Sequence, residues 1–208
     1  MTETMFKMQS REENLEGVAA TVPAPILRLS KCVIRPYYDD DAQVSAKEAN
    51  NAKIARYMRN AFPHPYTIKD AEGWIAFTKA SSPLLDFAIC RPDTQVLIGG
   101  IGLKPRTDIE HRTMEVGYWL GEQHWGQGVA TEALAAFVKW AFKQFNHVIR
   151  LEAKVAADNT GSARVLEKAG FRLEGRMRRA VDKDGEVMDQ MLYSVLREEV
   201  LEQTWSSS

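Results

Sequence analysis

Two glycines open the stretch of the chain best suited to holding a ligand. Gly126 and Gly128 lie in residues 124–133, where no charged side chain occurs before Glu132. Apolar residues then recur with a period near 3.6, at Ala130, Leu134, Phe137, Val138, Ala141, Phe142 and Phe145. The glycines therefore precede a helix N-terminus, where amide N–H groups are unpaired and the helix dipole is positive. This arrangement predicts a phosphate-binding turn.

A predicted strand over residues 114–120 leads into this turn, and several unrelated folds bind phosphate with a strand, a glycine turn and a helix. A Walker loop would need Gly-Lys-Ser/Thr, which is absent. A dinucleotide fingerprint would need a small residue where Thr131 stands and an acidic residue about 20 positions further on. The pattern that remains is Gly126-x-Gly128-x-Ala130.

That spacing, with the strand before it, resembles the acetyl-coenzyme A signature of the GNAT acyltransferase superfamily. The runs 115–120 and 125–133 are similar to its RimJ/RimL-like branch. Residues 159–171 carry a second, independent resemblance, to the GNAT segment that borders the coenzyme. Together the two motifs and the order of elements cover roughly residues 26–200.

The resemblance implies acetyl-CoA as co-substrate, with no metal. It places the pantetheine arm against the backbone of Trp119 and Leu120, and against Asn159 and Ser162. Arg164 and Lys168, one helical turn apart, would meet the coenzyme phosphates, unless they are simply a solvated helix face. The turn residues expected to hold the pyrophosphate are Trp125, Gly126, Gln127, Gly128, Val129, Ala130 and Thr131.

Two side chains are candidates for proton transfer. Glu115 lies in the strand that ends at the coenzyme, and the resemblance suggests it as general base. Alternatively, Glu115 binds a cationic acceptor or pairs with an arginine of the sheet. Many GNAT enzymes have a tyrosine general acid where Leu166 stands here, so we assign that role to Ser162. Ser162 could instead only cap its helix or bond the pantetheine.

The acceptor side is predicted to lie in the first half of the chain. A proline-rich loop over residues 62–67 separates a broken helix at about 42–60 from a helix at about 68–80. In the related family this region lines the acceptor pocket, which suggests His64, Tyr66 and Trp74 as substrate-binding residues beside Glu115. A packing role explains such aromatic residues equally well.

The remaining elements complete an α/β (α+β) fold. We expect a first strand over residues 26–35 interrupted at Ser30-Lys31, then a helix start at Asp39–Asp41 that we interpret as solvated. A strand at about 149–155 follows the main helix, so it should run parallel to strand 114–120. The resemblance implies a mixed, mostly antiparallel sheet, with its central parallel pair splayed to hold acetyl-CoA and helices on both faces.

Composition bounds the remaining possibilities. The chain has 208 residues, 45% of them hydrophobic and 26% charged, with a net charge of −1. These values are typical of a soluble protein, and they favour neither a nucleic-acid nor a membrane partner. We expect a flexible extension at residues 1–24, a GNAT domain at 25–203 and a frayed tail at 204–208. We also expect a cytoplasmic location and a monomer or homodimer.

The sequence therefore predicts an acetyl-CoA-dependent N-acetyltransferase that acts on a primary amine. The amine would belong to a protein N-terminus or to a small molecule. The alternative, prompted by Leu166, is a non-catalytic acyl-CoA-binding module.

Overall fold

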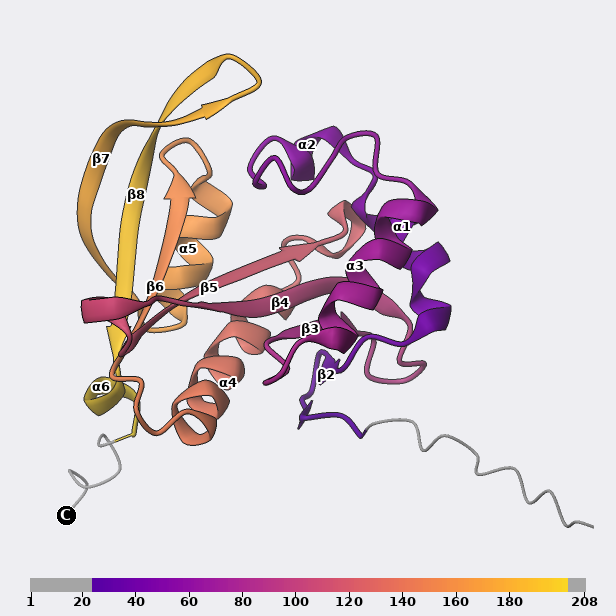
Figure 1. Ribbon diagram of the computed structural model, residues 1–208, viewed down its shortest axis with the longest axis horizontal. Coiled ribbons are helices and arrows are strands. Elements are labelled where there is room, and N and C mark those ends of the chain that lie inside the picture. The colour runs from indigo at the N-terminus through magenta and orange to yellow at the C-terminus, as the bar shows by residue number, and fades with distance from the viewer. Residues whose placement is uncertain (1–23, 202–208) are drawn as a thin grey trace, which may run out of the picture.

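A single eight-stranded sheet forms the centre of the molecule in the computed structural model, which describes residues 24–201 (Figure 1). Its strand order is β1-β2-β3-β4-β5-β6-β8-β7. All neighbouring strands are antiparallel except β5 and β6, which are parallel as predicted. The strands are β1 (Leu27–Arg28), β2 (Val33–Arg35), β3 (Asp86–Cys90), β4 (Leu97–Pro105), β5 (Thr113–Leu120), β6 (Arg150–Ala156), β7 (Arg172–Lys183) and β8 (Glu186–Leu196).

Helices cover both faces of this sheet. The α-helices are α1 (Ala42–Ala49), α2 (Ala52–Ala55), α3 (Ile68–Ala80), α4 (Val129–Gln144), α5 (Thr160–Lys168) and α6 (Arg197–Leu201), and the 3-10 turns are η1 (Asp39–Asp41), η2 (Asp108–Glu110) and η3 (Glu122–His124). The larger core contains Phe137 of α4 and Leu166 of α5, whereas the smaller contains Ala46 of α1 and Ile75 of α3. The two cores lie on opposite faces of the sheet, which we call the α4 face and the α3 face.

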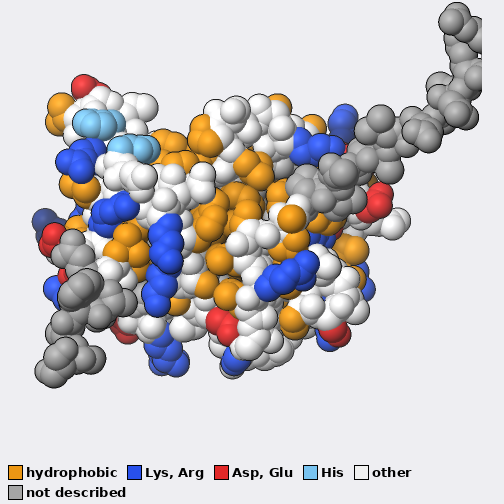
Figure 2. All heavy atoms as spheres, turned by 90° about the horizontal axis from the view of Figure 1, so that it is seen from below, with side chains coloured by type: hydrophobic (Ala, Val, Ile, Leu, Met, Phe, Trp, Pro, Cys, Tyr) orange, Lys and Arg blue, Asp and Glu red, His pale blue; other side chains and the backbone are white. Residues whose placement is uncertain are grey.

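Figure 2 views the molecule from the side on which α4 lies, with apolar side chains near the centre and lysine and arginine side chains around them. Within residues 24–201, no helix combines the length and the apolar character needed to cross a bilayer.

The parallel pair separates part-way along its length. Only residues 113–115 of β5 pair with residues 150–152 of β6, although both strands continue beyond that point. Figure 1 shows the two strands diverging, with β6 remaining beside β8. The predicted splay is confirmed, and it leaves residues 116–120 of β5 without a strand partner on the β6 side.

The start of the sheet differs from the prediction of one interrupted strand. Leu27 lies opposite Ile34, so β1 and β2 form an antiparallel hairpin with Ser30-Lys31 at its turn. The Ser30 hydroxyl and the Lys31 amide both donate to the Glu132 carboxylate of α4. This long-range contact, which local sequence does not reveal, stabilises the reversal.

The first helical region also needs correction. Asp39 and Asp40 are exposed as expected, but Asp41 is buried and accepts two 2.7 Å hydrogen bonds from the Arg35 guanidinium. The expected break at Asn50-Asn51 is present, and α2 ends at Ala55 rather than near residue 60. The predicted extension, apart from Ala24, and the predicted tail lie outside the described residues.

Candidate active site

The glycine turn has the geometry that the sequence predicted. Gly126 and Gly128 have φ angles of 72° and 78°, in the left-handed region that favours glycine, and α4 begins at the next residue, Val129. The first-turn N–H groups of a helix have no carbonyl partner within the helix. Residues 126–131 therefore offer backbone donors at the positive end of the α4 dipole.

A lysine from the β1–β2 turn, at one edge of the sheet, lies over the glycine turn. Lys31 Nζ donates a 2.7 Å hydrogen bond to the Gln127 carbonyl. It is so close that a Cβ added at Gly128 would come within 2.9 Å of it. Lys31 thus adds a positive charge at the predicted phosphate site. Sequence reasoning missed it because nothing local relates the β1–β2 turn to residue 128.

Strand register decides which backbone groups face the splay. Gly121 N–H donates to the Ile98 carbonyl, and Leu120 lies opposite Gly99, so Leu120 belongs to a non-hydrogen-bonded pair with β4. The peptide groups of Leu120, and by alternation those of Tyr118, therefore point toward the splay. Those of Trp119 point toward β4, so the predicted pantetheine contact at the Trp119 backbone is wrong.

The Leu120 edge also has an internal partner. Trp125 Nε1 donates a 2.8 Å hydrogen bond to the Leu120 carbonyl, which ties the glycine turn to the end of β5. The Trp125 side chain nevertheless remains 44% exposed beside the turn. The indole of Trp119 lies on the α3 face, with its ring centroid 5.8 Å from that of Phe62.

Ser162 lies across the splay from β5 on the α4 face. Asn159 caps α5 as predicted, because its side chain accepts a 3.1 Å hydrogen bond from the Ser162 amide. The Ser162 hydroxyl is therefore not needed for capping, and it lies 2.8 Å from the Tyr118 hydroxyl. Burial raises the pKa of Tyr118 to about 12, so that hydroxyl keeps its proton at neutral pH.

Tyr118 was not singled out from the sequence. The resemblance places the family's tyrosine on the helix at position 166, where Leu166 is fully buried in the core. The structure instead brings a tyrosine hydroxyl to the site from the facing strand. Only the packing of β5 against α5 shows that the Tyr118 hydroxyl lies beside Ser162.

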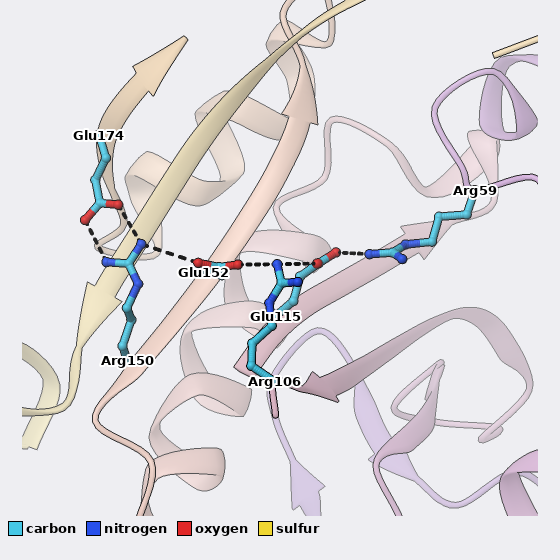
Figure 3. Close-up of polar contacts among 6 residues, drawn as sticks. All are labelled: Arg59, Arg106, Glu115, Arg150, Glu152 and Glu174. Carbon is cyan, nitrogen blue, oxygen red and sulfur yellow. Dashed lines mark hydrogen bonds and ion pairs between the residues drawn. The ribbon is translucent and has the colours of Figure 1, made fainter. Parts of the chain in front are cut away.

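Glu115 lies within a line of alternating charges across the sheet (Figure 3). Its carboxylate is 2.5 Å from Arg59 and 3.4 Å from Arg106. The line continues through Glu152 and Arg150 to Glu174. The side chain of Glu115 is 14% exposed, whereas that of Arg59 is 60% exposed. Glu115 therefore pairs with two arginines, and Arg59 is the partner that solvent reaches.

Glu115 and Tyr118 point to opposite faces of the sheet. Met114 and Val116 belong to the α4-face core, so Glu115, between them in β5, faces α3. Tyr118 packs against the α4-face core and reaches Ser162 there. A ligand held in the splay would thus meet a carboxylate from one face and hydroxyls from the other.

A cleft of about 710 Å³ opens between α2 and the tip of the β7–β8 hairpin, which face one another in Figure 1. His64 lines this cleft, but Tyr66 and Trp74 are not among its lining residues. Tyr66 is buried in the α3-face core, where burial raises its pKa to about 12. Trp74, 37% exposed on α3, has its ring stacked 5.5 Å from that of Phe77.

Arg164 and Lys168 are exposed on α5, one turn apart as expected. Neither forms a hydrogen bond or ion pair within residues 24–201. Both alternatives for these two side chains, phosphate contact and a solvated face, remain compatible with the structure.

Comparison with known proteins identifies the family. Residues 31–172 match the model of the acetyltransferase (GNAT) domain. The chain is also 30% identical to an uncharacterized N-acetyltransferase, YoaA, of Bacillus subtilis, over 83% of this chain and 97% of that relative. The chain belongs to the GNAT acetyltransferase family.

Two further similarities concern the RimJ/RimL-like branch. This GNAT chain is 38% identical to the Escherichia coli ribosomal-protein-serine acetyltransferase, over 40% of this chain and 46% of that protein. Its fold matches that of Mycobacterium smegmatis RimJ in complex with CoA-disulfide, with a TM-score of 0.72 and 25% identity. That match covers 82% of this chain and 84% of the other. The predicted resemblance to the family and to this branch is confirmed.

Proposed function

We propose that this protein transfers the acetyl group of acetyl-CoA directly to a primary amine, on a protein N-terminus or a small molecule. The observation that carries the proposal is the splayed β5–β6 pair, which lies between the left-handed glycine turn and the largely buried carboxylate of Glu115. The turn suits a pyrophosphate, and the edge of β5 at Tyr118 and Leu120, which has no strand partner on the β6 side, suits an amide-containing arm. No other part of the described chain combines these features.

The side chains around the splay have separate roles in this proposal. The amine nitrogen forms a bond to the acetyl carbon, the carbon–sulfur bond breaks, and a thiolate leaves. Glu115 accepts the proton that the amine loses, directly or through water. The Ser162 hydroxyl, bonded to Tyr118, donates toward the leaving sulfur on the other face of the sheet.

An assay of free CoA thiol against a panel of amines tests the proposal. Acetyl-CoA-dependent release with at least one amine is expected. Tight binding of acetyl-CoA by calorimetry, with no turnover on any amine or N-terminal peptide, would instead support the non-catalytic binding module.

The role of Glu115 has its own test. Glu115→Gln should lower kcat about 10-fold or more at neutral pH, because the amine loses its proton acceptor. Partial recovery is expected at higher pH, where more of the amine is already deprotonated. Steady-state kinetics over a pH series measures both effects.

Glu152→Gln is the matched control. Glu152 shares Arg106 with Glu115 and lies beside it in the β5–β6 register, but on the neighbouring strand. If the two substitutions lower kcat equally, the loss comes from the line of charges and not from a base at residue 115.

A further inference from the structure

On the α3 face, the adjacent strands β4 and β5 have glycines directly opposite each other, so neither strand places a side chain over the sheet there. Asp86 of β3 lies opposite Gly102 of β4, which lies opposite Gly117 of β5. Opposed residues share a face of a sheet, so the two glycines form a floor beside Asp86. Glu115 and Trp119, two residues either side of Gly117 in the same strand, border this floor on the same face.

The Asp86 carboxylate lies directly over this floor. A Cβ added at Gly102 would come within 2.0 Å of Asp86 Oδ1, so Gly102 is required for the carboxylate to lie there. Asp86 is partly buried and forms no hydrogen bond or ion pair among residues 24–201. Burial raises its pKa to about 6, and Tyr37 is an ionisable group close enough to interact with it. Burying a carboxylate without a hydrogen bond or an ion pair costs folding free energy, so stability alone does not explain why Asp86 lies here.

Space is available next to it. Gly117 is exposed although it lies in the middle of a central strand, and no heavy atom lies within 4 Å of a Cβ built there. Adjacent strands are about 4.8 Å apart, so this space lies within reach of both the Asp86 carboxylate and the splayed edge of β5.

The two carboxylates that border this floor differ in what neutralises them. Glu115 already has Arg59 and Arg106. Asp86 has no cation of its own in the described chain, and the indole of Trp119 lies over Gly100, in the neighbouring row of the same face. A carboxylate and an indole face are both groups that bind organic cations.

We propose that Asp86 binds a second cationic group of the acceptor, whose body lies over Gly117. This inference rests on the proposed acetyl transfer and names its substrate class, an amine that carries another positive group. The second charge would lie about 5–10 Å from the reacting nitrogen, which is one to two strand spacings.

Matched amines test this directly. Putrescine and n-butylamine have the same carbon chain, but n-butylamine lacks the second ammonium. The wild-type protein should have a kcat/KM about 10- to 100-fold higher for putrescine, because a charged hydrogen bond is lost with n-butylamine. Asp86→Asn should reduce that preference to within about threefold. Equal use of the two amines by the wild type, or an unchanged preference in Asp86→Asn, overturns the proposal.

Two further variants separate binding from folding. Gly117→Ala adds a methyl group to open space without backbone strain, so it should leave thermal unfolding unchanged while raising the KM for putrescine. Asp40→Asn removes an exposed carboxylate elsewhere and should change neither quantity. An unchanged KM in Gly117→Ala contradicts the placement of the acceptor over this floor.

A binding measurement keeps this inference distinct from the proposed activity. Putrescine is titrated by calorimetry into protein saturated with coenzyme A, for the wild type and Asp86→Asn. Binding that depends on Asp86 supports the site even if no amine is acetylated. Turnover of putrescine with equal binding by both proteins removes Asp86 and leaves acetyl transfer intact.

Discussion

The two sides of the splay are built in different ways. On the α4 face, the predicted coenzyme site consists mainly of backbone: a glycine turn, a helix N-terminus and a strand edge that lacks a strand partner. On the α3 face, the proposed acceptor site consists of side chains from β3, β5 and the loop after α2. The first is a local structure of consecutive residues, whereas the second exists only once distant segments have packed.

This difference separates what each side can recognise. Backbone donors at a helix N-terminus bind an anion whatever the neighbouring side chains are. Carboxylates spaced across strands discriminate between acceptors by charge and length. We therefore expect substitutions in the turn to affect coenzyme binding with every acceptor, and substitutions on the α3 face to affect some acceptors only.

The largest effect should come from Gly128→Ala. Alanine at a φ of 78° is strained by about 1–2 kcal/mol, and its Cβ would displace Lys31 and obstruct close approach of a phosphate. We expect the Kd for acetyl-CoA, measured by calorimetry, to rise about 30-fold or more.

Gly170→Ala is the matched control for that prediction. Gly170 ends α5 with a φ of 93°, and nothing lies within 4 Å of a Cβ built there. It should therefore cost similar stability without weakening coenzyme binding. An equal rise in Kd for the two variants would show that strain, not the phosphate site, causes the loss.

A smaller effect, of about 10-fold in kcat, is expected for Ser162→Ala. Tyr118→Phe should produce a similar loss, since the two hydroxyls are 2.8 Å apart and act together. The double variant should then be little worse than either single one. Saturating both substrates in the thiol-release assay isolates kcat, and fully additive losses would contradict a joint role.

Much of the framework is predictable because its signals are local. Thr67 caps a helix that begins at Ile68 and ends at Ala80, as the sequence indicates. Asn159 and Gly170 likewise bound the short helix through a side-chain cap and a left-handed residue. The parallel β5–β6 pair follows from the helix that separates them. Each of these features depends on residues within one element or on elements consecutive in the chain.

Three of the incorrect or missing assignments depend on long-range geometry. The backbone direction at Trp119 is set by pairing with β4, and the hairpin at Ser30-Lys31 is stabilised by α4. Tyr118 reaches Ser162 only because β5 and α5 face each other across the splay. A periodicity or motif carries no information about such pairings, so neighbouring elements had to be seen together.

Lys31 tests this comparison with the smallest expected effect, because it brings a side chain from a distant segment to the backbone-built side. Lys31→Met should raise the Kd for acetyl-CoA about two- to fivefold, as expected for an exposed charge pair. The difference should shrink as salt rises from low to physiological concentration, because screening weakens exposed charges. Lys139→Met makes the same charge change about 15 Å further along α4, beyond the Debye length of about 8 Å, and should have no such effect. Equal, salt-independent Kd values for the wild type and Lys31→Met would mean that the turn binds its anion through backbone groups alone.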